Sequence, residues 1–192
     1  MASVINLLHY RNSVQQPILI LAGLHQSDQP GFDWGGLKDV LGNCKAILTS
    51  ARSAGIPVAF VRCIAPPLSV SELRTYPTWL KGFEPTRNDM IFDVLQPSCY
   101  SNSEFSQAME YINGNFAIAG LFGETTCLST AIDAHHRRHS ITYLSDASAC
   151  RNSGSFPASL FHDAISHVIS VYGNTMETAQ WCRSLRFSRS MP

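Results

Sequence analysis

Short apolar stretches alternate with segments of helical periodicity along most of this chain, and this alternation limits the possible folds more than any other feature. The run PILILAG at 17–23 is apolar on both faces, which is typical of a buried strand. In 36–54 apolar residues recur with a helical period, and Gly55 follows where a glycine cap is expected. Further strands are predicted at 57–62, 90–95, 115–120, 140–145 and 168–173, and further helices at 103–112, 125–138, 156–168 and 176–185.

This order predicts an α/β fold with three layers, α/β/α, in which helices cover both faces of a Rossmann-like parallel six-stranded sheet. The length suits a single domain over 1–192, with a core at about 17–183. Such sheets bind ligands beyond the carboxyl ends of their strands, where the strand order reverses. We therefore expect the functional residues in three segments, 24–28, 96–100 and 121–127.

The composition argues against several classes of partner and site. The net charge is zero, the pI is about 7.0 and charged residues make up 15% of the chain, so neither a nucleic acid nor a membrane is the expected partner. The six cysteines are scattered and form no zinc or disulfide pattern. We expect a cytoplasmic protein without a metal or cofactor, and its charge-poor surface favours a homo-oligomer.

One long stretch, 63–88, interrupts the alternation. Loops of this length in a compact domain are usually lids or binding elements. Its aromatic residues Tyr76, Trp79 and Phe83 are therefore candidates to cover a pocket or to pack in an oligomer interface.

A run of cationic and imidazole side chains, 135–139, ends the predicted helix at 125–138. Cations at a helix C-terminus complement the helix dipole. We prefer this interpretation to a metal site, because His135 and His139 have no acidic partner nearby in the sequence.

Four segments carry a resemblance to a known family. They read AILTSARSAGIPVAFVR, EPTRNDMIFDVLQPSCYSNSEF, AGLFGETTCLSTAIDA and ITYLSDASA. From about residue 17 to about residue 183, the chain resembles the isochorismatase-like hydrolases, also called the cysteine hydrolase superfamily. The resemblance implies the three-layer fold. It also implies a catalytic triad of an Asp general base, a Lys that stabilises charge and a Cys nucleophile, which in this family hydrolyses amides.

The family spacing places different residues at the three triad positions. Counted from neighbouring motifs, the acid, lysine and nucleophile positions hold Gly23 or Leu24, Val94 and Thr126. Cys127 takes the following position, where it shares an apolar helix face with the core. Three replacements predict that the usual chemistry is absent. The chain is then a pseudoenzyme that binds or responds to a small molecule, and the sequence does not identify that molecule.

A hydrolase with a rewired site is the alternative. Thr126 or Cys127 would be the nucleophile and His25 the base, acting on a small amide-type substrate. The resemblance further implies an oxyanion-type turn at Phe122 and Gly123, and a cis peptide bond between Leu121 and Phe122. Neither catalytic pair can work unless its side chains lie within about 3 Å of each other.

Overall fold

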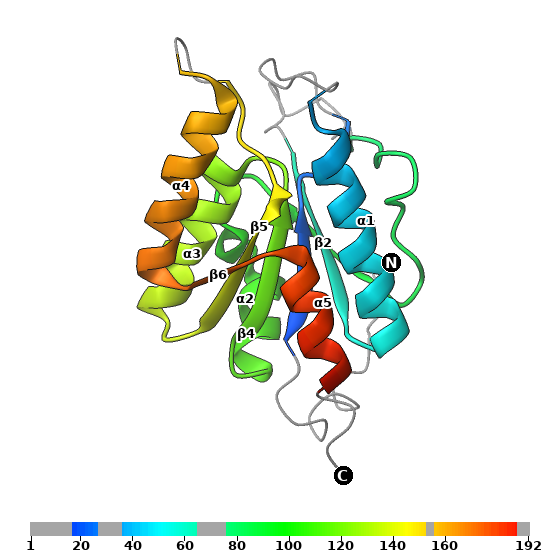
Figure 1. The fold of residues 1–192 in the computed structure, drawn as a ribbon. Coiled ribbons are helices and arrows are strands. Elements are labelled where there is room, and N and C mark those ends of the chain that lie inside the picture. Colours follow the sequence, from blue (N-terminus) through cyan, green and yellow to red (C-terminus); the bar gives the residue numbers. More distant parts are fainter. Residues whose placement is uncertain (1–16, 27–35, 65–75, 153–155, 188–192) are drawn as a thin grey trace, which may run out of the picture.

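The sheet occupies the centre of the molecule and all of its strands run parallel. The computed structural model describes residues 17–26, 36–64, 76–152 and 156–187. The strand order is β3-β2-β1-β4-β5-β6, with parallel pairing throughout (Figure 1). The strands are β1 (Ile18–Ala22), β2 (Val58–Cys63), β3 (Met90–Val94), β4 (Asn115–Gly120), β5 (Ser140–Ser148) and β6 (Asn174–Met176).

Helices cover both faces of this sheet, as the alternation predicts. On one face lie α1 (Lys38–Ala54) and α5 (Thr178–Phe187), and on the other lie α2 (Ser103–Tyr111), α3 (Leu128–His136) and α4 (Ala158–Tyr172) (Figure 1). Successive strand residues point to opposite faces, so each face builds its own apolar core. Ile20 and Ile118 pack under α2, α3 and α4, whereas Leu21 and Ala117 pack under α1 and α5. None of the described helices is long and apolar enough to cross a membrane.

The strand predicted at 168–173 is wrong, because these residues continue α4 to Tyr172. The run VISVYG is rich in β-branched residues, which favours a strand when it is considered alone. The buried positions Ile165 and Ile169 lie one helical turn apart, however, and extend the period of the helix into this run. The sixth strand follows directly, at Asn174–Met176.

The carboxyl ends of β1 and β4 lie unusually close together. Gly120 has a φ of 126°, and a Cβ atom there would lie 2.0 Å from the carbonyl oxygen of Ala22. Only glycine therefore allows this approach. It brings the turn after β4 against the end of β1, where the candidate site is built.

Part of the long stretch 63–88 covers the end of β1. Gln26 donates its backbone N–H to the carbonyl of Thr78 at 2.7 Å, and Leu80 donates to the carbonyl of Leu24 at 3.0 Å. An antiparallel bridge joins His25 and Trp79 between these two bonds. The segment 76–83 thus fixes the backbone beyond β1, while 65–75 lies outside the described residues.

Candidate functional site

The turn between β4 and α3 forms the floor of the candidate site. Phe122 adopts the left-handed region with a φ of 63°, and the π-helical turn η3 (Gly123–Cys127) then leads into α3. The carbonyl of Phe122 accepts N–H groups from Thr125 at 3.1 Å, Thr126 at 2.8 Å and Cys127 at 3.4 Å. Gly123 donates its N–H to the carbonyl of Ala149 at 2.9 Å. These helix-start donors are therefore bonded to main-chain oxygens.

The peptide bond between Leu121 and Phe122 is trans, so the cis bond implied by the family resemblance is wrong. The described residues contain no cis peptide bond. The chain reverses direction here through positive φ values instead, at Gly120 and at Phe122. The two residues expected in an oxyanion-type turn, Phe122 and Gly123, do lie at the start of η3.

His25, Cys63 and Thr126 form a chain of contacts across the carboxyl edge of the sheet. The backbone N–H of Cys63 donates to His25 Nε2 at 3.2 Å, and Cys63 Sγ lies 3.4 Å from Thr126 Oγ1. The structure thus brings His25 and Thr126 to one place, with Cys63 between them. Sequence reasoning missed Cys63, although it ends β2, the strand beside β1 in the sheet.

The contacts of His25 specify a neutral imidazole. Its Nδ1 lies 3.0 Å from the carbonyl oxygen of Gln26, which can only accept a hydrogen bond, so Nδ1 donates. Its Nε2 accepts the N–H of Cys63. Burial lowers the pKa of His25, and the hydrogen bond to Gln26 offsets part of this effect. The lone pair that a general base would use is the one that accepts the N–H of Cys63.

The ring of Phe122 occupies the space beside Gly23. Gly23 has a φ of 72°, and a Cβ atom there would lie 2.6 Å from Phe122 Cδ2. Leu24 is completely buried in the same apolar core as Phe122. Neither residue proposed for the acid position therefore offers a polar group to the site.

The two remaining positions are also enclosed. Val94 is buried in the core under α2, α3 and α4, and so is Cys127. Burial raises the pKa of Cys127 well above the usual value for a thiol, so this sulfur carries its proton at neutral pH. Thr126 is 1% exposed, and its neighbour Cys63 has a pKa raised by burial and partly lowered by the Thr126 hydroxyl.

One ion pair lies beside the turn. Arg151 Nε donates to Glu124 Oε1 at 2.6 Å, and the guanidinium carbon lies 5.1 Å from the centre of the Phe122 ring. The Glu124 side chain is only 9% exposed, so the pair is largely shielded from water. Its opposite charges neutralise each other, and the edge of the site carries little net charge.

The candidate residues show no arrangement typical of a metal centre. Within the described ranges, no group of three or more His, Cys, Asp or Glu residues is arranged to hold a metal ion. In the cluster at 135–139, His139 Nδ1 lies 2.7 Å from the hydroxyl of Tyr100, and Arg137 lies over the same ring. These contacts tie the end of α3 to η2 (Cys99–Ser101). Asp28, in the segment 24–28 where functional residues are expected, lies outside the described residues.

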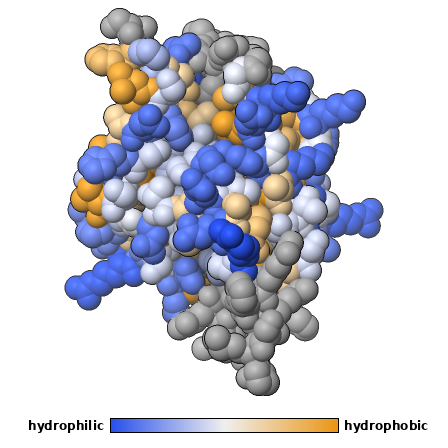
Figure 2. Space-filling model, viewed as in Figure 1, coloured by the Kyte–Doolittle hydropathy of each residue, from blue (hydrophilic) through white to orange (hydrophobic). Residues whose placement is uncertain are grey.

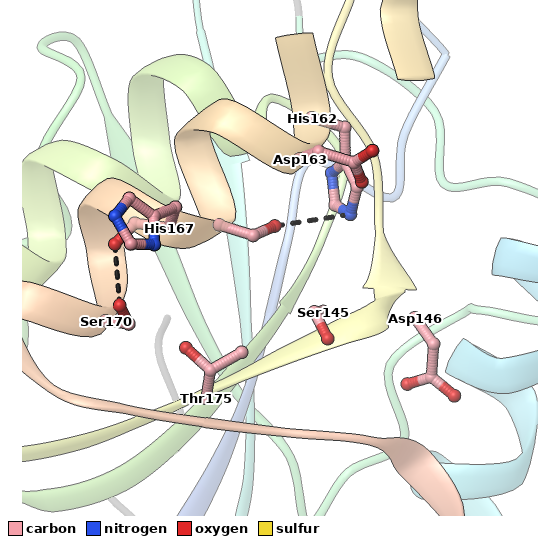
Figure 3. A pocket seen from close by; sticks show the side chains of 8 residues that line it. Ser145, Asp146, His162, Asp163, His167, Ser170 and Thr175 are labelled. Atoms are coloured by element: carbon pink, nitrogen blue, oxygen red, sulfur yellow. Dashed lines mark hydrogen bonds between the residues drawn. The ribbon is translucent and has the colours of Figure 1, made fainter. Parts of the chain in front are cut away.

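A separate hollow of about 460 Å³ opens between α4 and the strands β5 and β6 (Figure 3). Several of its polar groups bond within the protein. His162 Nε2 lies 3.4 Å from Ser166 Oγ, and Ser170 Oγ donates to the carbonyl of His167 at 2.6 Å (Figure 3). The hollow is lined by Ser145, Asp146, His162, Asp163, Ser166, His167, Ser170 and Thr175.

Solved structures with the same fold include proteins named as a cysteine hydrolase, an isochorismatase and an amidase. A cysteine hydrolase from Pseudomonas syringae is 19% identical, with a TM-score of 0.77 over 90% of this chain and 93% of that chain. An isochorismatase from Pseudomonas putida is 18% identical, with a TM-score of 0.72 over 86% of this chain and 92% of that chain. N-carbamoylsarcosine amidase from Thermoplasma acidophilum is 14% identical, with a TM-score of 0.67 over 85% of this chain and 97% of that chain. At these identities the similarity demonstrates the fold alone.

The sequence itself places the chain in a family. A search among curated protein sequences gave no match. The family model described as the isochorismatase domain matches residues 20–180, which include most of β1, all of β2 to β6 and of α1 to α4, and the first residues of α5. The chain therefore belongs to the isochorismatase domain family.

Proposed function

We propose that this protein binds a small molecule at the carboxyl edge of the sheet and does not hydrolyse it by the triad mechanism that the family resemblance implies. The observation that carries the proposal is the ring of Phe122 beside Gly23. A carboxylate on position 23 would have to occupy the space that this ring fills. General-base catalysis needs that carboxylate within hydrogen-bond reach of the nucleophile.

The other triad positions support the same conclusion. Val94 is an apolar side chain in the core and stabilises no charge. Thr126 and Cys127 are enclosed, and the backbone donors nearest to them already bond to the carbonyl of Phe122. An oxyanion would have to displace these bonds, at a cost of about 1–3 kcal/mol for each group left unpaired.

The chemistry of the surrounding groups favours a neutral, partly aromatic ligand. The nearby charges of Glu124 and Arg151 pair with each other. His25 is neutral and contacts the rings of Phe122 and Trp79, with ring centres 6.2 and 6.3 Å away. Aromatic walls with a few polar groups are typical of small-molecule sites.

An activity assay separates this proposal from a rewired hydrolase. The chain of contacts from His25 through Cys63 to Thr126 is the observation that favours hydrolysis. We expect no turnover of small amides or of a vinyl-ether substrate above the buffer rate, in wild type or in Thr126→Ala and Cys127→Ala. Turnover that either substitution abolishes would establish the rewired hydrolase and reject the proposal.

A thermal-shift screen tests binding directly. Small neutral carboxamides and aromatic amides are suitable probes, and a compound at 100 times its Kd stabilises by about 2.7 kcal/mol. We expect the shift to be lost in Thr126→Val, which removes one hydroxyl, and kept in Thr175→Val on the distant, exposed strand β6. The proposed site would be wrong if no compound raises the Tm, or if both variants respond like wild type.

A further inference from the structure

An exposed apolar row runs along the outer face of α4. Its large members are Phe156, Leu160, Val168 and Val171, which are 59%, 57%, 40% and 68% exposed. Ala164, in the middle of the helix, is exposed as well. Figure 2 shows hydrophobic side chains along the edge of the molecule that α4 forms in Figure 1. Spacings of four and three residues place Leu160, Ala164, Val168 and Val171 on one side of the helix, and Phe156 lies two residues before its first turn.

The row lies outside the core of the protein. The opposite side of α4 carries Ile165 and Ile169, which are buried against α3 and the sheet. This helix is therefore anchored without any help from the exposed row. Its apolar side chains remain in contact with water in the single chain.

We propose that the row is the contact surface for a second copy of this chain, with the two α4 helices packed antiparallel about a two-fold axis near Ala164. The exposed fractions correspond to roughly 400 Å² of apolar side chain on each copy, since a large side chain offers about 150–250 Å². Two such rows bury about 800 Å² together. The polar groups beside them raise the total toward the ~1,200 Å² at which specific interfaces begin.

The residues at and beside the row fit a self-complementary contact. In an isologous interface each residue meets its counterpart across the axis. Ala164 is small, so it permits a close approach where the helices cross. On one flank of the row lie Asp163 and His167, one helical turn apart. Antiparallel pairing brings Asp163 of each copy beside the turn that carries His167 in the other.

The charges of α4 disfavour a lipid surface as the occupant. The helix contains neither Lys nor Arg, and cationic side chains are what attract anionic headgroups. The whole chain has zero net charge, so two copies approach without long-range repulsion. This proposal is independent of what the site at β1 and β4 binds.

Sedimentation velocity of the full chain, from low to high micromolar concentration, tests the proposal. We expect wild type to form dimers, and Leu160→Glu combined with Val171→Glu to weaken them by at least about a hundredfold in Kd. Leu95→Glu is the matched control, because Leu95 is 43% exposed and follows β3 at the opposite edge of the sheet. Circular dichroism confirms that the variants keep their fold.

Three outcomes would overturn the proposal. They are a wild type that stays monomeric at every concentration, a dimer that only Leu95→Glu dissociates, and a monomer that binds anionic lipid vesicles through the row. A second measurement does not depend on charged substitutions. Under mild oxidation Ala164→Cys is expected to form a disulfide-linked dimer that wild type and Ser103→Cys, on α2, do not form. Equal cross-linking of the two variants would contradict the antiparallel geometry.

Discussion

Gly23 occupies a position that accommodates no side chain larger than hydrogen. Its positive φ and the Phe122 ring, 2.6 Å from an ideal Cβ, both oppose a substitution. We expect Gly23→Ala to lower the free energy of unfolding by about 2 kcal/mol or more, measured by urea denaturation.

Gly42 provides the matched control for this substitution. It is exposed within α1, and a Cβ atom there meets no other atom within 4 Å. Gly42→Ala is expected to stabilise the protein by about 0.5–1 kcal/mol, because alanine favours the helix. Equal effects at the two positions would show that Phe122 does not limit the space beside Gly23.

At the scale of single residues, the sequence predicted burial better than it predicted contacts. The helical period placed Cys127 in the core, and the structure confirms this. Cys63 escaped notice because its role depends on the neighbouring strand rather than on its own segment. The trans bond before Phe122 was missed because a family resemblance carries no information about dihedral angles in this chain.

Among the secondary-structure elements, α5 is capped at its N-terminus by one carboxylate from the sheet. Asp146, near the end of β5, accepts from the backbone N–H of Thr178 at 2.7 Å and from its hydroxyl at 2.8 Å. Thr178 begins α5, so Asp146 satisfies a donor that the helix itself leaves unpaired. We expect Asp146→Ala to destabilise the protein by about 1–2 kcal/mol in urea denaturation.

Two variants distinguish this cap from a general effect of charge. Asp146→Asn keeps an acceptor oxygen and should lose less stability than Asp146→Ala. Glu110→Ala removes a carboxylate that is 65% exposed and only 3.9 Å from Arg137, so its effect should be within about 0.5 kcal/mol of zero. The cap assignment is untenable if Asp146→Ala is as mild as Glu110→Ala.

Most helices and strands could be predicted because each is long enough to show its helical period or its apolar run. The exception was 168–173, where a short β-branched run satisfies both a helical and an extended pattern. Contacts with α3 and the sheet decide in favour of the helix, and these contacts are not visible in the local sequence. Ile165 and Ile169 lie one helical turn apart. A longer stretch of sequence, read together with 168–173, would have shown this helical spacing.

For the molecule as a whole, one buried and two half-buried histidines link stability to pH. Burial lowers the pKa of His25, His139 and His162. Below about pH 6.5 the unfolded chain therefore binds more protons than the folded chain. The free energy of unfolding should therefore fall as the pH drops from 7 toward 5.5. His25, which is 2% exposed, can contribute up to about 1.4 kcal/mol per pH unit.

Urea denaturation at several pH values checks this dependence. His25→Gln should flatten the slope between pH 7 and 5.5, whereas Gly42→Ala, which changes no titratable group, should leave it unchanged. Arg62 and Asp93 also act on His25, and they are present in both variants. If His25→Gln keeps the wild-type slope, burial of this imidazole does not control the pH response.

The layer arrangement and the parallel sheet follow from the sequence because strand and helix patterns alternate. The sequence does not predict which residues meet at the site, because this depends on which strands lie next to each other in the sheet. The residues that meet at the carboxyl edge come from β1, β2 and β4 and from the start of α3. Their packing distances are set by Gly23 and Gly120, whose importance appears only when the opposing atoms are known.

The strand order also determines which strand edges are unpaired while the chain is being synthesised. Leu19 can pair with Val58 as soon as β2 has been synthesised. Ile18 cannot pair with Phe116 until β4 has been synthesised, much later. Until β4 emerges, a nascent chain can assemble only the half-sheet β3-β2-β1, with the open hydrogen-bonding edge of β1 and its apolar faces unprotected. The most buried strand of the finished protein is thus the most vulnerable one during translation, when pairing with another nascent chain competes with the arrival of β4.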